Sequence, residues 1–489
     1  MKISRIMSTQ HPDNVAIPFF AEKSVMGGDD EIKEASYLFS ELGIDEQLWD
    51  AEGKEVDNFV VKKLLTKHQA YFQKNILGKD KFLTLRLPNP EIEKDDGKIL
   101  MEALHSIPRN ADLGMKFYEK PVAPIFEVVL PMCSSEKSIL RVHEYYKKFI
   151  IGKQSEKLFP GDLTISEWVG KLSPSDIRVT PLFETKEAIL QADKYVEKYM
   201  AFEKIKELQR VWFARSDPAL NYGSLSNVLL VKIGLQRLHQ LEQKTSVEIL
   251  PILGCGSAPF RGNFKPTNVD KMLQGYPSVQ TFTAQSAFKY DFPVKQVIDG
   301  IETIKATKRK EPRAIDEEFC TKLVNKIEKD YQESVRLLAD TINKMSVFVP
   351  SRRKRKLHTD LFGYARHHGA IQLPRAIPFC ASLYSLGLPP DILGLSQVTP
   401  QELDKVRECY TTIDSDLKDA FQYFNKDNLW FFPQEVQKKV LKALNLFEFE
   451  VNEEHKVCSS TIMAAFRSNQ KEAISEEILK AGRIRQFLG

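Results

Sequence analysis

The sequence lacks the features that mark a membrane-spanning, secreted or zinc-binding protein. No run of roughly 18 or more apolar residues occurs, so we expect no membrane helix. The opening residues, MKISRIMSTQHPDN, contain no apolar segment typical of a signal peptide. The cysteines are scattered without a CxxC pair, which argues against a zinc site or a disulfide framework: Cys133, Cys255, Cys320, Cys380, Cys409 and Cys458. We therefore expect a cytoplasmic protein.

The chain also has no large excess of positive or negative charge. The formal net charge is +4 over 489 residues, which gives no reason to expect nucleic acid or a membrane surface as a partner. No P-loop pattern GxxxxGK[ST] occurs, so the usual nucleotide cradle is not expected. With 42% hydrophobic residues, the chain is expected to be globular and to bury a large core.

Strand-like and helix-like segments alternate in the middle of the chain. Short apolar runs predict strands at residues 125–130, 178–183, 211–214, 247–253 and 279–284. Helical patterns fall at residues 135–150, 186–207, 224–243 and 292–305. This alternation is typical of a parallel α/β sheet or barrel, and we interpret it as a barrel.

The two ends of the chain differ from the middle. Residues 31–79 are mostly helical in pattern, with a polar break at Asp50–Asp57, and residues 81–87 resemble a strand. Nearly every segment from 315 onward is helical: 315–346, 373–387, 400–424, 433–445 and 469–485. The expected fold class is α/β, a (β/α)8 TIM-type barrel with a large additional α-helical C-terminal region.

We expect three sections that together form one integrated catalytic domain. Residues 1–120 would be a largely helical N-terminal segment that contributes to the active site. Residues 121–315 would form the main barrel section, and residues 316–489 a helix-rich section packed on the barrel.

Two carboxylates, Glu184 and Asp217, each follow an apolar run that predicts a strand. Parallel barrel strands deliver their C-terminal ends to one mouth, where catalytic groups gather. Two oxygen ligands there would suit a magnesium ion with open positions for a phosphate-bearing substrate. The alternative is a first-turn or N-cap acid, because Asp217 precedes Pro218 and proline favours the first helical turn.

A glycine-rich segment, Gly254–Gly262, directly follows another predicted strand. Its glycines, Gly256 among them, would let backbone N–H groups approach an anion, and Arg261 would add a bidentate grip. The alternative is a glycine turn with a surface arginine. His11 lies in a Ser-Thr-Gln-His-Pro-Asp-Asn segment and is either an acid–base group or part of a simple turn.

Two basic features also allow more than one interpretation. Arg375 begins an apolar helix, where it needs either a salt bridge or an anion. A basic run is a nucleic-acid site, an anion-binding loop over an active site or, most commonly, a solvated face: Arg352, Arg353, Lys354, Arg355 and Lys356, with Arg366, His367 and His368 beyond it.

Six segments, in order, resemble phosphoenolpyruvate carboxylases. They are His11–Asn14, Phe82–Arg86, Pro181–Thr185, Ser216–Gly223, Gly256–Gly262 and Thr283–Tyr290. The chain length and the Met-Ser-Thr-Gln-His-Pro-Asp-Asn opening resemble the short, archaeal-type form of the family. The likeness runs along essentially the whole chain to Gly489.

This resemblance implies a carboxy-lyase with a β/α barrel, usually a homotetramer, that uses magnesium or manganese. It would convert phosphoenolpyruvate and bicarbonate to oxaloacetate and phosphate through carboxyphosphate and a metal-bound enolate. That is an anaplerotic carbon-fixation step that feeds the tricarboxylic acid cycle. The nearest alternative is another magnesium-dependent barrel lyase of enolate chemistry; a nucleic-acid-binding protein and a catalytically idle relative are more distant ones.

Residue roles carry over by motif. Glu184 and Asp217 match the metal ligands, and His11 matches a histidine thought to assist carboxylation. Arg261 matches an arginine on the phosphate or carboxylate side of the substrate. Arg86 matches an arginine that lies upstream of the Phe-Glu-Thr motif.

The chain also departs from the long bacterial and plant form. The glycine-rich loop of that form begins with a histidine and an arginine, where this chain has Leu253–Gly256. The lysine of its Ser-Asp motif is replaced near Asn221, and a later arginine falls at or near Leu386. Other cations would therefore bind the phosphate. The expected substrate-binding residues are Arg352, Arg353, Arg355, Arg366, Arg375 and Gly256.

Overall fold

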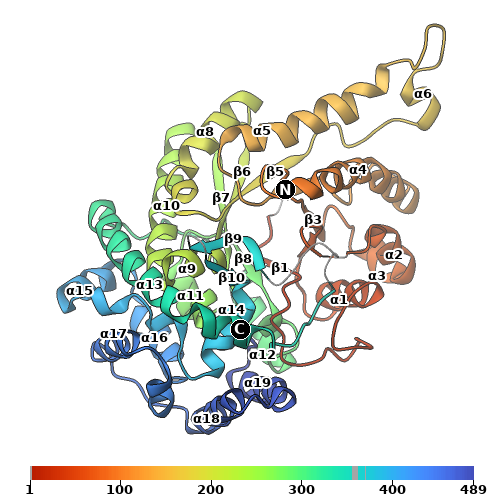
Figure 1. Ribbon diagram of the computed structural model, residues 1–489. Coiled ribbons are helices and arrows are strands. Elements are labelled where there is room, and N and C mark those ends of the chain that lie inside the picture. The colour runs from red at the N-terminus through yellow and green to blue at the C-terminus, as the bar shows by residue number, and fades with distance from the viewer. Residues whose placement is uncertain (1–2, 55, 355–361, 369–370) are drawn as a thin grey trace.

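Eight parallel strands close into a barrel with helices around its outside (Figure 1). The computed structural model describes residues 3–54, 56–354, 362–368 and 371–489. The barrel strands are β1 (Ile6–Ser8), β2 (Glu46–Asp50), β3 (Phe82–Arg86), β4 (Glu127–Leu130), β5 (Arg178–Phe183), β6 (Leu208–Ala214), β7 (Glu248–Gly254) and β8 (Thr281–Ala284). They pair in chain order, and β1 closes the ring against β8 with Met7 opposite Thr283. The predicted (β/α)8 barrel is confirmed.

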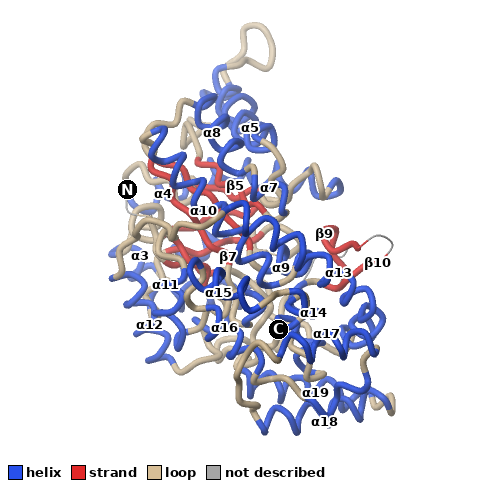
Figure 2. Tube along the Cα trace, turned by 90° about the vertical axis from the view of Figure 1, so that its left-hand side faces the viewer, coloured by secondary structure: helices blue, strands red, loops and turns tan. Residues whose placement is uncertain are grey.

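Helices connect the strands and enclose them, as Figure 2 shows. The connecting helices are α1 (Asp29–Ser40), α2 (Val60–Lys67), α3 (Gln69–Lys74), α4 (Gly97–Tyr118), α5 (Glu136–Tyr145), α6 (Ile165–Val169), α7 (Lys186–Leu190), α8 (Ala192–Glu203), α9 (Ser216–Tyr222), α10 (Ser224–Thr245), α11 (Val269–Gly275) and α12 (Val294–Ala306). None of the helices in the described part of the chain is long and apolar enough to cross a membrane.

The region after α12, which itself follows the last barrel strand, is mainly helical. It contains α13 (Glu317–Ser346), the hairpin β9 (Phe362–His368) and β10 (Ile371–Pro374), α14 (Ala376–Ser385), α15 (Pro400–Cys409), α16 (Ile413–Phe421), α17 (Gln434–Leu444), α18 (Glu453–Arg467) and α19 (Lys471–Arg485). The Asp316 side chain caps α13 by accepting from the Phe319 N–H. α13 packs on α9 and α10, and the Tyr331 hydroxyl donates to the Leu220 carbonyl at 2.9 Å.

The barrel begins earlier in the chain than expected. Strands β1, β2 and β3 all lie within residues 1–120, so the barrel section is not confined to residues 121–315. The region 31–79, read as mostly helical, contains β2. This strand escaped detection because it reads Glu-Gln-Leu-Trp-Asp, and its buried Glu46 is paired with Arg210 at 2.8 Å. Polar residues that are neutralised inside a barrel do not produce the apolar pattern of a strand.

Two smaller expectations also need correction. The single helix expected at 400–424 is two helices, α15 and α16, separated at Tyr410–Thr412. The helix expected at 373–387 begins at Ala376, because residues 371–374 pair with β9.

The barrel interior is packed with side chains rather than open. A separate apolar cluster draws on β1, β2, β4, β5, β6 and β7: Met7, Leu48, Val129, Leu182, Trp212, Ala214 and Ile252. Interior layers of this kind are usual in TIM barrels, and they leave the mouth at the C-terminal ends of the strands as the place for a site.

Candidate active site

A pocket lies at the C-terminal mouth of the barrel, and it gathers most of the residues expected from the sequence. It is lined by His11 after β1, Arg86 at the end of β3, Glu184 after β5, Asp217 after β6, Arg261 after β7 and Arg375 before α14. These side chains come from parts of the chain hundreds of residues apart. The mouth brings them together because all parallel strands point the same way.

The two carboxylates face the same pocket from neighbouring strands. Glu184 accepts a hydrogen bond from the Met132 N–H at 2.8 Å, and its Oε1 lies 4.0 Å from Nη2 of Arg86. Burial raises the pKa of Glu184 to about 8; Arg86 opposes that rise and the negative charge of Asp217 adds to it. Asp217 stands in the first turn of α9, whose N-cap residue is Arg215. Of the two structural alternatives, the first-turn position is confirmed and the N-cap position is wrong, and Asp217 lines the pocket from that first turn.

This pair fits a magnesium or manganese ion. Within the described residues no group of three or more His, Cys, Asp or Glu side chains gathers as a complete metal cage. Magnesium needs no such cage, because it usually takes one or two carboxylates and completes its shell with water and substrate oxygens. A buried glutamate whose pKa is raised beside a second carboxylate is an environment that a divalent cation would relieve.

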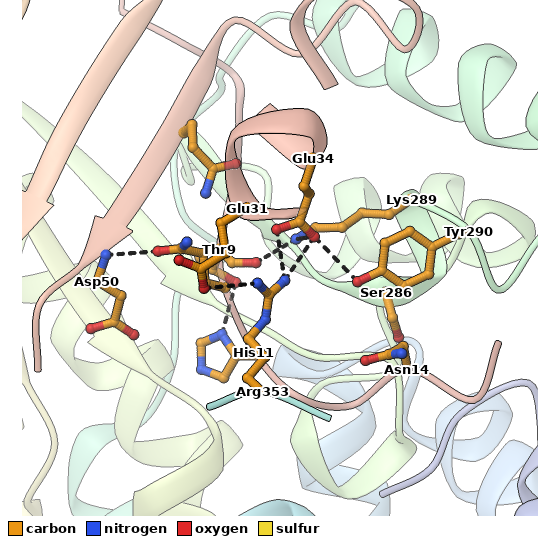
Figure 3. A network of polar contacts seen from close by, with 12 residues as sticks. Thr9, His11, Asn14, Glu31, Glu34, Asp50, Ser286, Lys289, Tyr290 and Arg353 are labelled. Carbon is orange, nitrogen blue, oxygen red and sulfur yellow. Dashed lines mark hydrogen bonds and ion pairs between the residues drawn. The ribbon is translucent and has the colours of Figure 1, made fainter. Parts of the chain in front are cut away.

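His11 is buried and held in one orientation. Its Nδ1 lies 2.8 Å from the Thr9 hydroxyl, and Figure 3 shows this contact at the edge of a larger polar network. Lys289 donates to the Thr9 carbonyl at 2.6 Å and to Glu34 at 3.0 Å, which ties the loop after β1 to the loop after β8 and to α1. Burial lowers the pKa of His11 well below its usual value, and the surrounding cations lower it further. The imidazole is therefore neutral near pH 7.

Arg261 is fully buried and already has several partners within the protein. Its Nε donates to the Ser216 hydroxyl at 3.2 Å, and its Nη1 donates to the Gly489 carbonyl at 2.6 Å. Its Nη2 donates to Gln285. These contacts fix the guanidinium at the wall of the pocket.

Gly256 makes room for this arginine. A Cβ on Gly256 would lie 2.8 Å from the Gln285 Oε1 and 2.9 Å from the Arg261 Cζ. Contacts that short force a shift, so the glycine allows Arg261 and Gln285 to meet. The expected contact of Gly256 with substrate stays a prediction.

Comparison with known proteins adds the family. A sequence model described as phosphoenolpyruvate carboxylase matches residues 3–489. The chain belongs to the phosphoenolpyruvate carboxylase family. Proteins of that name from Methanospirillum hungatei and Methanothermobacter thermautotrophicus are 48% and 47% identical to it over 489 residues, which is 100% of each chain. A malate synthase structure from Haloferax volcanii is similar with a TM-score of 0.36 and 10% identity, over 84% of this chain and 97% of that one, too distant to argue from.

The two arginines of the basic run that the structure describes, Arg352 and Arg353, pair with groups of the protein itself. Arg352 donates to the carbonyls of Asn14 at 2.9 Å and Val15 at 3.3 Å. Both oxygens of Glu34 lie 2.7 Å from Nη2 of Arg353, and Glu31 lies 3.3 Å from its Nη1 (Figure 3). Both arginines are buried and neither lines the pocket. In the sequence, a basic run resembles a solvated or ligand-binding loop because such buried partners lie far away along the chain. Substrate binding by these two arginines stays a prediction that the pocket lining does not support.

The remaining expected arginines divide into two groups. Arg355 lies outside the described residues, and Arg366 belongs to β9, where only the backbone is described. Arg375 lines the pocket, and its buried Nε has no hydrogen-bond partner in the part of the chain that the structure describes. An unpartnered buried guanidinium nitrogen costs free energy, so an anion in the pocket would stabilise it.

Sequence reasoning missed the residues that follow β2. Glu52 and Lys54 line the pocket, and Asp50 lies buried at the end of that strand. All three fall in the segment Asp50–Asp57, which was read as a polar break between helices. Recognition of β2 as a strand would have pointed to them by the same mouth rule that found Glu184.

Proposed function

We propose that this protein carboxylates phosphoenolpyruvate with bicarbonate and releases oxaloacetate and phosphate. The observation that carries the proposal is the convergence on one pocket of five residues from the family's motifs: His11, Arg86, Glu184, Asp217 and Arg261. A family motif preserved only in sequence would be weaker support, because function depends on the assembled site.

The cations of the pocket would hold the phosphate and carboxylate of the substrate. Arg261 is fixed by its own hydrogen bonds, and the Nε of Arg375 has no hydrogen-bond partner among the described residues. Guanidinium groups make strong charge-assisted bonds to phosphate, and catalysis of phosphoryl transfer is largely a matter of positioning and charge. A bicarbonate oxygen would attack the phosphorus, and the enolate oxygen of the substrate would leave, which yields carboxyphosphate and the enolate of pyruvate.

Glu184 and Asp217 would hold the divalent cation. When bound, magnesium or manganese would supply positive charge that neutralises the phosphate and the developing enolate oxygen.

His11 would then act as a base on carboxyphosphate. In the proposed tautomer, Nδ1–H of His11 donates to the Thr9 hydroxyl across their 2.8 Å contact. Nε2 then carries the lone pair and takes the proton of the carboxyphosphate carboxyl group. The bond between the carboxyl carbon and the bridging oxygen then breaks, so inorganic phosphate leaves and carbon dioxide is released beside the enolate. The methylene carbon of the enolate bonds to the carbon of carbon dioxide, and the enolate oxygen becomes the keto oxygen of oxaloacetate. Water must be excluded, since protonation of the enolate would give pyruvate.

The wider biological setting follows from the same proposal. The reaction would replenish oxaloacetate for the tricarboxylic acid cycle in the cytoplasm, and a homotetramer is the assembly expected from the family resemblance. Ultracentrifugation of the purified protein tests the assembly: a monomer at working concentration would contradict it.

A coupled assay tests the function. Purified protein is mixed with phosphoenolpyruvate, bicarbonate and Mg2+, and malate dehydrogenase with NADH reports oxaloacetate. The expected result is NADH consumption that needs both substrates and the metal and that stops with EDTA. Phosphate release without oxaloacetate would indicate an enolate lost to water. Neither product from folded protein would favour a different barrel lyase.

A further inference from the structure

A lysine that no sequence motif singled out lies inside the pocket. Lys54 follows β2, and its side chain is 8% exposed. Its ammonium group pairs with Asp50, the last residue of that strand, whose side chain is fully buried. Burial lowers the pKa of Lys54, and the negative charges of Asp50 and Glu52 act in the opposite direction.

The pairing with Asp50 leaves donors of Lys54 for a ligand. An ammonium group has three N–H donors, and Asp50 is the acceptor that the described residues provide through a direct hydrogen bond. Arg86 engages the same aspartate at 3.5 Å and Glu52 at 2.5 Å. Asp50 is thus shared between two cations, and Lys54 is a pocket-lining cation whose charge Asp50 offsets only in part.

The overall charge of the pocket calls for anions. Its lining includes four cationic side chains, Lys54, Arg86, Arg261 and Arg375, and three carboxylates. Two of those carboxylates, Glu184 and Asp217, are the proposed ligands of a divalent cation, which leaves Glu52 as the balancing acid. The cations then face two anionic substrates, one of which carries both a phosphate and a carboxylate.

Barrel order places the strands that precede His11 and Lys54 opposite the strands that precede the two carboxylates. In a closed ring of eight strands, β2 stands opposite β6 and β1 opposite β5. Lys54 and His11 therefore lie across the mouth from Asp217 and Glu184. The enolate would form on the side of Glu184 and Asp217. The carboxyl group that is transferred to the enolate would approach from the opposite side, where His11 accepts the proton of that carboxyl group.

The charges that act on His11 agree with this placement of Lys54. Among the cations around His11, Lys54 has the strongest effect on its pKa, ahead of Arg261 and Arg86. Coulomb effects fall with distance, so this ranking indicates a short path between the ammonium group and the imidazole.

We propose that Lys54 binds bicarbonate beside His11 and holds the same carboxyl group after it becomes part of carboxyphosphate. This inference rests on the proposed function. The ammonium donates to a bicarbonate oxygen that is not the attacking one, and it neither gains nor loses a proton in the reaction.

The test compares apparent KM values in the coupled assay. For Lys54→Met we expect the KM for bicarbonate to rise by about 10- to 100-fold, the usual cost of a charge-assisted bond. The KM for phosphoenolpyruvate should change little. A KM for phosphoenolpyruvate that rises instead, or a bicarbonate KM equal to that of the wild type, would overturn the inference.

Two further variants separate ligand binding from a structural role. Lys54→Met leaves Asp50 with one cation fewer, so the double variant Lys54→Met/Asp50→Asn removes both charges of the pair. If Lys54 binds bicarbonate, the double variant keeps the raised KM for bicarbonate; a return to the wild-type value would mean that Lys54 serves only as the counter-ion of Asp50. Lys81→Met is the matched control, because Lys81 is a buried lysine paired with Asp45 at 2.8 Å just before β3, at the other end of the barrel.

The wild-type protein in the same assay separates the two proposals. Oxaloacetate formation that saturates with bicarbonate, together with unchanged variants, would overturn the role of Lys54 alone. A wild-type protein that forms no oxaloacetate would overturn the proposed function and this inference with it.

Discussion

The two ends of the barrel both contain buried charges, but they balance them differently. At the amino ends of the strands, Arg210 lies 2.8 Å from Glu46 and 2.8 Å from Glu127. Thr84, Thr180 and Arg178 complete this closed cluster, so each of the four carboxylate oxygens accepts a hydrogen bond. At the carboxyl ends, the charges line the pocket at the barrel mouth, which is larger than the small cavity beside the Arg210 cluster and leaves space for a ligand.

The pKa values of two glutamates express this difference. Burial alone would raise the pKa of Glu127, but Arg210 and Arg178 hold it below its usual value. Burial raises the pKa of Glu184 to about 8, because Arg86 compensates only in part and Asp217 adds negative charge. Buried charge by itself therefore says little about function. A carboxylate whose charge the protein leaves uncompensated is the better indicator of a site.

The largest effect on activity is expected when a carboxylate at the barrel mouth is replaced by a neutral side chain. Asp217→Asn should lower kcat by roughly 10³-fold without unfolding the protein, since a catalytic metal supplies several kcal/mol of charge stabilisation. Steady-state rates at several Mg2+ concentrations, with circular dichroism as the folding control, measure it. Near-normal activity at limiting Mg2+ would remove Asp217 from the metal site.

Opening the closed cluster should affect stability rather than chemistry. Arg210→Met leaves Glu46 and Glu127 buried beside an apolar group, so we expect a loss of about 3–5 kcal/mol in unfolding free energy. Thermal denaturation checks this, with activity per folded molecule measured below the transition. Arg178→Met is the control and should lower the unfolding free energy less, because the Arg178 side chain is 19% exposed and its ion pair here is with Glu127. An unchanged melting temperature for Arg210→Met would show that the cluster is dispensable.

A change at His11 should separate the two halves of the reaction. His11→Asn is expected to retain phosphoenolpyruvate cleavage while oxaloacetate formation falls by about 10²-fold, because general-base catalysis is lost. Phosphate and oxaloacetate measured in the same samples give the ratio. If both rates fall equally, His11 acts before or during phosphoryl transfer.

The smallest expected effect is an absence of pH dependence. The pKa of His11 is lowered by burial and by neighbouring cations, so the imidazole stays neutral as the pH falls through 6.5, where a free histidine becomes protonated. The ratio of oxaloacetate to phosphate should therefore remain constant between about pH 7.5 and pH 6. A ratio that halves near pH 6.5 would mean that His11 is exposed to ordinary titration.

Some features of the fold were predictable and others were not, for identifiable reasons. Strands such as β5 and β7 have six and seven residues and are mostly apolar, which makes them visible in the sequence. β1 has three residues, and β2 buries Glu46 and Gln47 in place of apolar side chains. Neither produces a periodic apolar signal, so the barrel section was placed too late in the chain.

Some residues of the site were also predictable from the sequence, and others were not. Glu184, Asp217 and Arg261 were found because each follows a recognisable strand and belongs to a family motif. Lys54 was missed together with its strand. Arg352 and Arg353 were assigned to substrate because their partners, the Asn14 carbonyl and Glu34, lie more than 300 residues away in the sequence.

The sequence by itself determined the barrel class, the family and the identity of the groups that carry the chemistry, because these depend on local strand patterns and on short motifs. The tertiary structure decided which cations face the pocket and which are consumed by structural pairs. Charge is a local property of a side chain, but compensation of that charge depends on neighbours brought together by folding. That is why Lys54 lies in the pocket while Arg353 pairs with Glu34 outside it.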